Sequence, residues 1–250
     1  MRCKILHLSL CLPGLFLAAQ AHAFDLPEVA YPEIAEHART PVDFVPPGWR
    51  LEHQVRGRLD GDQRDDALLI LRMEDPANLI DDPVSGPASF DTNPRMLVAA
   101  VATADGGWRR VMADHALVPR PQSPVMADYL GEDAAGAVQI RHNRTWTLGL
   151  HSWTSAGGWS RRDVTYTFRL EGECMRLVGY DETDVHRGSG DINQTSVNYL
   201  TGRAWTQLGH ISEDESRPQR WTRLATRARI CIDDIGHGLS FEPGLLETRQ

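Results

Sequence analysis

The residues best suited to chemistry in this chain are the carboxylates of one short segment, residues 57–66, which reads GRLDGDQRDD. Asp60, Asp62 and Asp66 lie in this segment, and an apolar run at residues 67–71 follows at once. A hard cation such as Ca²⁺ collects several carboxylate and carbonyl oxygens from one short, sharply turned segment. The alternating carboxylates and the glycine before a strand are therefore what a Ca²⁺ loop needs.

The same segment resembles the FG-GAP or VCBS-type calcium repeat of integrin α-chain propellers and of many secreted bacterial proteins. The resemblance places Asp60, Asp62 and Asp66 at ligand positions and implies a Ca²⁺ loop before a strand. Arg58 stands where the first carboxylate should be, and Gln63 replaces the turn glycine. A cation at a ligand position removes one oxygen and repels the ion. The alternative is a metal-free turn in which Arg58 pairs with one of the aspartates.

Tryptophan side chains form the second group of candidates. Trp153 and Trp159 flank the turn that contains Gly157 and Gly158. Large aromatic side chains are mostly buried, so packing is the first expectation. Exposed rings at this turn would instead form a platform for sugar rings or an anchor for a protein partner. Trp153 and Trp159 are therefore the candidate binding residues.

No catalytic residue is predicted. The nucleophile-elbow pattern Gly-x-Ser-x-Gly and the zinc pattern His-Glu-x-x-His are both absent from the chain. Asp181, Glu182, Asp184 and Asp191 have the chemistry for acid and base catalysis. They lie in a polar, glycine-bearing stretch and are interpreted as solvated loop charges.

The composition narrows the classes of partner. Once Arg2 and Lys4 are set aside with the N-terminal segment, the 26 basic residues become 24, all arginine, against 34 acidic ones. Residues 24–250 therefore carry a net charge of −10 and have no lysine for Schiff-base or P-loop chemistry. An acidic balance also argues against nucleic acid and anionic membranes as partners.

The N-terminus and the cysteines both predict export. Two basic residues, an apolar stretch at residues 5–19 and the sequence Ala-His-Ala at residues 21–23 are typical of a signal peptide cleaved after residue 23. No later segment is apolar enough to span a membrane. Cys174 and Cys231 then remain, and a pair in an oxidising compartment predicts a disulfide. Two unpaired buried thiols are the alternative.

Hydrophobic periodicity predicts the elements that position these residues. Residues 67–73 and 96–103 are apolar runs typical of strands buried on both faces. Residues 163–170 alternate apolar and polar side chains and predict a half-buried strand, with residues 174–180 as its antiparallel partner after a turn. The other predicted strands are residues 109–113, 137–142, 145–151, 203–208 and 225–232, and the predicted long surface loop is residues 74–94. A looser likeness to uncharacterised secreted bacterial proteins, at residues 166–169, 177–181 and 198–202, implies no known activity.

These patterns predict a mainly β fold of antiparallel sheets, as a sandwich or partial propeller, with long loops and little helix. The expected organisation is a signal peptide at residues 1–23, a Pro-rich arm at 24–49 with one or two helical turns near 33–37, and a single β domain at 50–250. The expected function is noncatalytic: binding of a protein or an envelope glycan through loops, in the periplasm or outside the cell. The alternative is a hydrolase that cleaves envelope polysaccharide or peptidoglycan with loop carboxylates.

Overall fold

The computed structural model of the chain describes residues 26–81, 89–131, 134–215, 217–225 and 229–245. The predicted signal peptide lies outside these residues. Among the described residues, no helix is long and apolar enough to cross a membrane. The disulfide and this finding are compatible with an exported protein.

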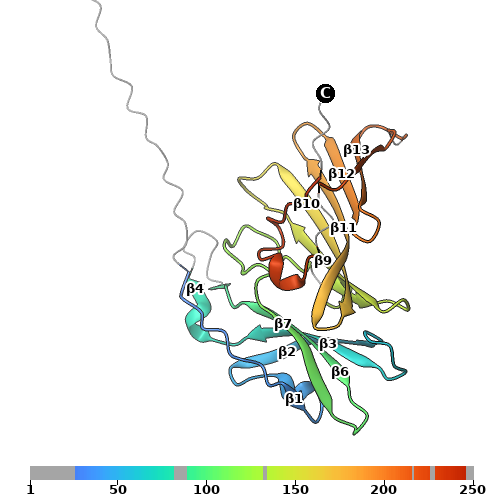
Figure 1. The fold of residues 1–250 in the computed structure, drawn as a ribbon. Coiled ribbons are helices and arrows are strands. Elements are labelled where there is room, and N and C mark those ends of the chain that lie inside the picture. Colours follow the sequence, from blue (N-terminus) through green and yellow to red (C-terminus); the bar gives the residue numbers. More distant parts are fainter. Residues whose placement is uncertain (1–25, 82–88, 132–133, 216, 226–228, 246–250) are drawn as a thin grey trace, which may run out of the picture.

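Two antiparallel sheets make up the fold (Figure 1). The five-stranded sheet has the order β1 (His37–Ala38), β7 (Trp108–Asp114), β6 (Arg95–Ala102), β3 (Asp66–Met73) and β2 (Trp49–Gly57). The seven-stranded sheet has the order β14 (Arg220–Arg223), β13 (Arg203–His210), β12 (Asp191–Asn198), β11 (Cys174–His186), β10 (Ser160–Glu171), β9 (Thr145–Ser152) and β8 (Val138–Ile140). A small hairpin pairs β4 (Leu79–Asp81) with β5 (Ser89–Asp91).

Helix is scarce in the described chain. It consists of α1 (Ala134–Ala137) and of 3₁₀ turns at Pro41–Phe44, Pro76–Asn78 and Ile232–Asp234. The prediction of a mainly β fold with antiparallel sheets and little helix is confirmed.

The central strands β3 and β6 are buried on both faces, as their apolar runs predict. Leu68 and Ile70 face the seven-stranded sheet and belong to a hydrophobic cluster that joins the two sheets. Leu69 and Leu71 face the other way, into a cluster completed by the N-terminal arm through Phe44 and other residues. The five-stranded sheet is therefore a middle layer between the arm and the second sheet.

The seven-stranded sheet stands on one face of the five-stranded sheet (Figure 1). Alternation along β10 buries Val164, Tyr166 and Phe168 completely or nearly so, as predicted. Trp146 of β9 stacks on Phe168, with ring centroids 4.7 Å apart. Apolar burial of this kind supplies most of the free energy that holds the sheets together.

The N-terminal arm differs from its prediction. Its helical turn lies at Pro41–Phe44 and not near residues 33–37. The carboxylate of Asp43 accepts a hydrogen bond from the backbone N–H of Thr40, and Pro41 has the fixed φ suited to the first position of a turn.

The predicted surface loop at residues 74–94 is also partly wrong. Its middle, residues 82–88, lies outside the described part, but its base is buried through Asn78, Thr92 and Asn93. Arg120 reaches this base and donates hydrogen bonds to the Asn78 side chain and to the Thr92 backbone and hydroxyl. A buried polar base satisfied by hydrogen bonds is stable inside the protein.

Two further predictions fail towards the C-terminus. The polar stretch after residue 180 is not a loop, because β11 runs on to His186 and β12 begins at Asp191. Asp181, Glu182, Asp184 and Asp191 therefore lie on paired strands. Around residues 225–232, where a strand was expected, Cys231 forms only an isolated bridge with Arg176, and the last strand is β14. Residues 226–228 of that range lie outside the described part.

Cys174 and Cys231 form the predicted disulfide, with Cα atoms 5.5 Å apart and a sequence separation of 57 residues. The bond attaches the C-terminal segment to the first residue of β11. Tyr166 strengthens the same attachment, since its hydroxyl donates a hydrogen bond to the carbonyl of Gly238. The C-terminal segment therefore covers the inner face of the seven-stranded sheet.

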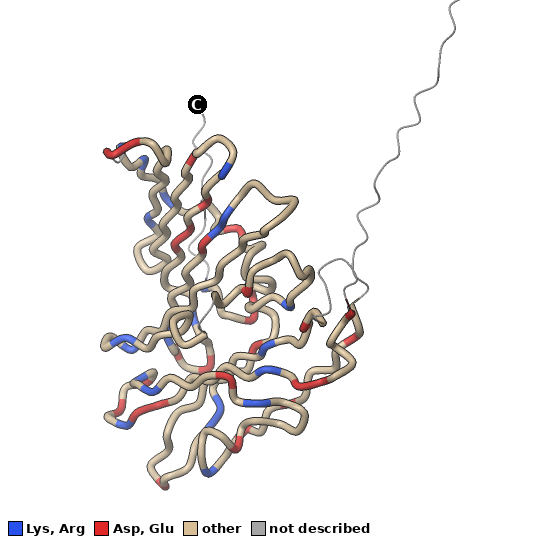
Figure 2. Tube along the Cα trace, turned by 180° about the vertical axis from the view of Figure 1, so that it is seen from behind, with Lys and Arg blue, Asp and Glu red and all other residues tan. Residues whose placement is uncertain are grey.

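A buried charge network links the two sheets. The guanidinium of Arg95, on β6, is 4% exposed and forms bidentate pairs with Glu52 of β2 and with Asp128. The segment that contains Asp128 runs beside β9, where the N–H of Ala127 donates to the carbonyl of Trp153. Figure 2 shows charged residues of both signs at this junction.

Both acidic members of this network stay ionised in the fold. Burial disfavours their charged forms, but the hydrogen bonds and charge of Arg95, aided by Arg72, outweigh burial and lower the pKa of Glu52 and of Asp128. The network is therefore a set of paired charges, whose members are costly to remove one at a time.

We expect Arg95→Met to lower the free energy of unfolding by about 3 kcal/mol, because it removes the main cation partner of the largely buried Glu52 and of the partly exposed Asp128 and leaves only Arg72 beside them. Arg50→Met is the matched control, since Arg50 is 43% exposed and contacts the edge of the same network. The control should cost less than about 1 kcal/mol. Urea denaturation measures both values, and equal losses would contradict the role given to Arg95.

The dependence of the free energy of unfolding on pH in the acid range provides a second test of this network. Because the folded pKa of Glu52 is lowered, its contribution is present above the unfolded pKa and is lost as the pH falls through the folded pKa. The stability difference between wild type and Glu52→Gln should therefore shrink in acid. The comparison isolates Glu52 from Asp66 and Asp114, whose pKa values burial raises.

Removal of the disulfide should cost about 4 kcal/mol of unfolding free energy, because the bond closes a long loop in the unfolded chain. The double variant Cys174→Ala/Cys231→Ala, compared with wild type in urea, tests this value. Wild type under reducing conditions should show the same loss. A variant as stable as the oxidised protein would show that the C-terminal segment is held by packing alone.

Candidate functional site

The loops at one end of the seven-stranded sheet form the candidate site. The loop after β9, the turn between β11 and β12 and the segment after β13 gather at the end seen at the top of Figure 1. Backbone hydrogen bonds connect them: Arg187 donates to the carbonyl of Trp159, and Ile211 to that of Gly190. They therefore form one continuous surface.

Trp153 and Trp159 are both exposed at this end, at 39% and 68%. The expectation that they pack inside the protein is wrong. β9 ends at Ser152 and β10 begins at Ser160, so Trp159 lies in the connection between the two strands. Trp153 lies one residue beyond β9, where its carbonyl accepts a hydrogen bond from the N–H of Ala127. By contrast, Trp146 lies within β9 and is completely buried.

Arg187 lies between the two tryptophans. Its guanidinium carbon is 5.5 Å from the centroid of the Trp153 ring, a cation–π contact. Its Nη2 donates hydrogen bonds to the carbonyls of Thr154 and Gly158. Among the described residues, no acidic side chain pairs with this guanidinium.

Trp159 is oriented by the neighbouring turn. Its ring stacks on His186, with centroids 6.5 Å apart and an interplanar angle of 24°. The ring of His186 is fixed in turn by Ser189, whose hydroxyl lies 2.9 Å from Nδ1 and whose backbone N–H donates to the same atom at 3.0 Å. The indole is therefore exposed but supported from one side.

The glycines of this loop open a hollow next to Trp159. At Gly158 a Cβ atom would lie 2.1 Å from the hydroxyl of Thr154, so only glycine fits there, and Gly157 has a φ of +76°. The hollow has a volume of about 380 Å³ and is lined by residues 155–159 and Arg187. We call it the tryptophan hollow. It combines a flat apolar wall with one cation and several backbone polar groups.

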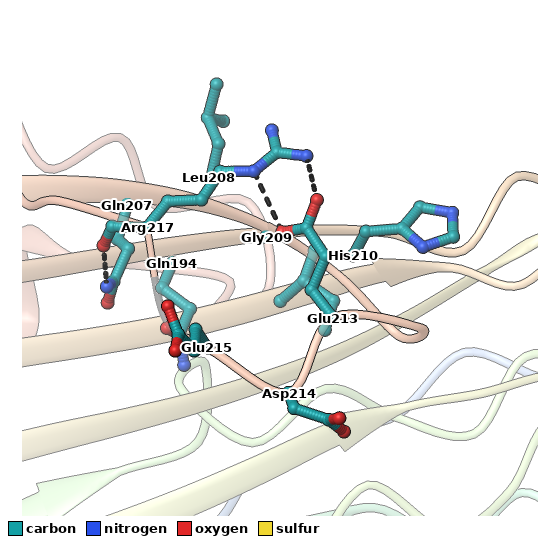
Figure 3. Close-up of a pocket in the computed structure, with 10 residues that line it drawn as sticks. Gln194, Gln207, Leu208, Gly209, His210, Glu213, Asp214, Glu215 and Arg217 are labelled. Carbon is teal, nitrogen blue, oxygen red and sulfur yellow. Dashed lines mark hydrogen bonds and ion pairs between the residues drawn. The ribbon is translucent and has the colours of Figure 1, made fainter.

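A second hollow, of about 230 Å³, lies at the edge of the same surface (Figure 3). Gln194 and Gln207 face each other across β12 and β13, and Figure 3 shows Glu215 beside Gln194. The side-chain amide of Gln207 donates to the carbonyl of Arg217. Glu213 and Arg217 form an ion pair above the hollow.

This second hollow contains a histidine and three carboxylates, the residue types that a hydrolase needs, but they do not converge. In Figure 3 the ring of His210 and the carboxylate of Asp214 both point away from Glu215. His210 is engaged with Ser212 and the carbonyl of Ser189. Hydrogen bonds from Arg217 lower the pKa of Glu213, whereas a general acid needs a raised pKa.

His151 and Asp163 form a further pair, with Nδ1 and Oδ1 2.5 Å apart on neighbouring strands. Arg161 also pairs with Asp163. In the described chain, no serine, threonine or cysteine side chain forms a hydrogen bond with the His151 ring, as a nucleophile activated by this histidine would. The pair forms a cross-strand hydrogen bond.

The acidic segment at residues 57–66 lies far from these loops, between β2 and β3. Asp66 is completely buried, and its carboxylate accepts hydrogen bonds from the backbone N–H groups of Leu59, Asp60 and Ala102 at 2.7, 3.1 and 3.0 Å. Backbone donors therefore occupy the oxygens that a metal would need. Burial raises the pKa of Asp66 in spite of these bonds.

The carboxylates of Asp60 and Asp62 also accept backbone hydrogen bonds within the turn. Asp60 accepts a hydrogen bond from the N–H of Asp62, and Asp62 from that of Arg64. Arg64 also forms an ion pair with Asp62, which is the partner role expected of Arg58. The described residues contain no group of three or more His, Cys, Asp or Glu side chains that could hold a metal. The aspartates are thus used within the turn itself, and the Ca²⁺ loop stays a prediction.

Comparison with protein-family models, with curated proteins and with solved structures finds no match for this chain. Function therefore has to be argued from the geometry of the site.

Sequence reasoning found Trp153 and Trp159 but missed Arg187 and His186, which complete their surroundings. The signal for them was weak, because both residues stand in a polar segment interpreted as a loop. Only the pairing of β11 with β10 brings residues 186 and 187 beside the loop after β9.

We expect Asp66→Asn to lower the free energy of unfolding by about 1–3 kcal/mol, because the amide cannot accept all three backbone N–H groups. Asp62→Asn, at the exposed end of the same turn, should cost much less. Ca²⁺ should leave the melting temperature of wild type unchanged, since bound metal would stabilise the fold. A rise with Ca²⁺ that a chelator reverses would contradict the metal-free turn.

Proposed function

We propose that this chain is an exported, noncatalytic binding protein that takes a saccharide chain of the cell envelope on Trp153 and Trp159. The observation that carries the proposal is the exposure of Trp159, at 68%, next to a hollow bounded by glycines and Arg187. An indole left in water keeps apolar area available for a ligand.

The chemistry of the tryptophan hollow suits a sugar. The C–H face of a pyranose ring is apolar and packs flat on an indole, while its hydroxyl groups need polar partners at the rim. The Nη1 and Nε groups of Arg187, which form no hydrogen bond with the described residues, and the backbone of residues 155–158 provide such partners. Arg187 also adds attraction for a sugar that carries a carboxylate.

A glycan fits this surface better than a protein does. A stable protein interface buries about 800 Å² on each partner and has an apolar centre. Here the two indoles are separated by a glycine-rich turn and bordered by Arg187 and His186. A narrow chain of rings needs only such a short platform with polar sides.

Location in the periplasm or outside the cell is part of the proposal. A disulfide such as Cys174–Cys231 persists in an oxidising compartment, which is where envelope glycans are found. The predicted signal peptide agrees with this location. The hydrolase alternative receives no comparable support, because the carboxylates and the histidine at this end of the sheet point apart.

We expect Trp159→Ala to weaken binding to purified peptidoglycan sacculi or to soluble chitohexaose by about tenfold, the loss of one central aromatic contact. Sedimentation with sacculi and quenching of tryptophan fluorescence by the oligosaccharide measure the effect. The variant should fold normally, because the removed ring is exposed.

Trp221→Ala is the matched control. Trp221 is 53% exposed and, like Trp153, lies under an arginine, here Arg203 at 4.7 Å, but it is on the edge strand β14. Binding by this variant should equal that of wild type. Wild type that binds none of a broad glycan panel, or equal losses in both variants, would refute the saccharide proposal.

A further inference from the structure

A third hollow lies at the opposite part of the molecule, where the end of β2 meets the turn between β8 and β9. It has a volume of about 350 Å³, within the range of small-molecule sites. Its charged lining consists of Arg56, Arg58, Arg141, His142 and a single carboxylate, that of Asp65. We call it the arginine hollow. Figure 2 shows the blue segments of these two loops at the same edge of the molecule.

The backbone is shaped to bring these arginines together. At Gly57 a Cβ atom would lie 2.8 Å from Cγ2 of Ile140, so glycine allows β2 to approach β8 closely. Arg56 and Arg58, on either side of Gly57, are thereby placed next to Arg141. The guanidinium of Arg56 is held over the Trp108 ring at 4.9 Å, a contact that leaves its N–H groups available.

The facing turn carries another arginine in a costly conformation. Arg144 has a φ of +62°, which glycine adopts freely and other residues rarely do. Its Nη1 would be 3.3 Å from a Cβ at Gly61, so its side chain reaches across to the loop after β2. Local strain of this kind is concentrated at functional sites.

The arginines at this hollow form no ion pair with the described residues. Within the described chain, Arg58, Arg141 and Arg144 form no ion pair, although the whole chain carries a net charge of −8 and has carboxylates to spare. Other arginines of the fold, such as Arg95 and Arg72, are paired. The nearby carboxylates of Asp60, Asp62 and Asp66 are engaged within their own loop.

We propose that the arginine hollow binds a dianionic oxyanion of the phosphate type, either free or as a phosphomonoester. The three guanidinium groups and the one carboxylate of the lining carry a summed charge of +2. This charge matches that of a dianion and is larger than a single carboxylate ligand would neutralise. The planar N–H fork of arginine fits phosphate oxygens in a bidentate manner. The segment at residues 57–66, whose sequence resembles a Ca²⁺ loop, therefore borders the proposed anion site.

Isothermal titration calorimetry of the full chain with inorganic phosphate, at constant ionic strength, tests the proposal. We expect saturable binding, a weaker response to acetate, and similar affinity for glucose 6-phosphate if the site recognises the phosphoryl group in both forms. Glucose is the neutral control. No saturable heat with either phosphate compound, or equal binding of acetate, would overturn the proposal.

Substitutions locate the site. Arg58→Gln and Arg141→Gln remove exposed side chains that have no protein partner, and each should weaken phosphate binding by about tenfold. Arg223→Gln, an exposed arginine on β14, removes the same charge elsewhere and should leave binding unchanged. Equal weakening in all three variants would show that net charge alone attracts the anion, and would reject a built site.

Discussion

The pairing of one buried guanidinium with two carboxylates is the interaction on which the rest of the structure depends. Arg95 lies in the middle layer of the fold, and its partners Glu52 and Asp128 belong to an edge strand and to the segment that leads into the second sheet. Hydrophobic contacts between the sheets are stronger in total but not directional. The charge network therefore adds a directional contact between the first sheet and the segment that runs beside the end of β9.

Once the sheets are fixed, their loop ends point to opposite parts of the molecule. One end of the seven-stranded sheet presents Trp153, Trp159 and Arg187. The junction with the first sheet presents the arginine hollow. Neither surface belongs to the core, so the residues there are free to serve recognition while burial elsewhere maintains the fold.

The acidic segment at residues 57–66 shows how one carboxylate pattern serves two purposes. The lone pairs of an aspartate can coordinate a cation or accept backbone N–H groups, and the same turn geometry suits both. In this chain Asp66 accepts three N–H groups and Arg64 neutralises Asp62. The aspartates therefore shape the turn, and Arg58 forms no ion pair with the described residues.

The sequence by itself determined the elements whose cause is local. Alternation predicted β10, apolar runs predicted β3 and β6, and the two cysteines predicted their bond. Only the tertiary structure decided that Trp153 and Trp159 stay exposed, that Arg64 takes the place expected of Arg58, and that Arg95 joins the sheets. These outcomes depend on contacts between residues distant in the chain, and side-chain pairing across such distances leaves no periodic signal in the sequence.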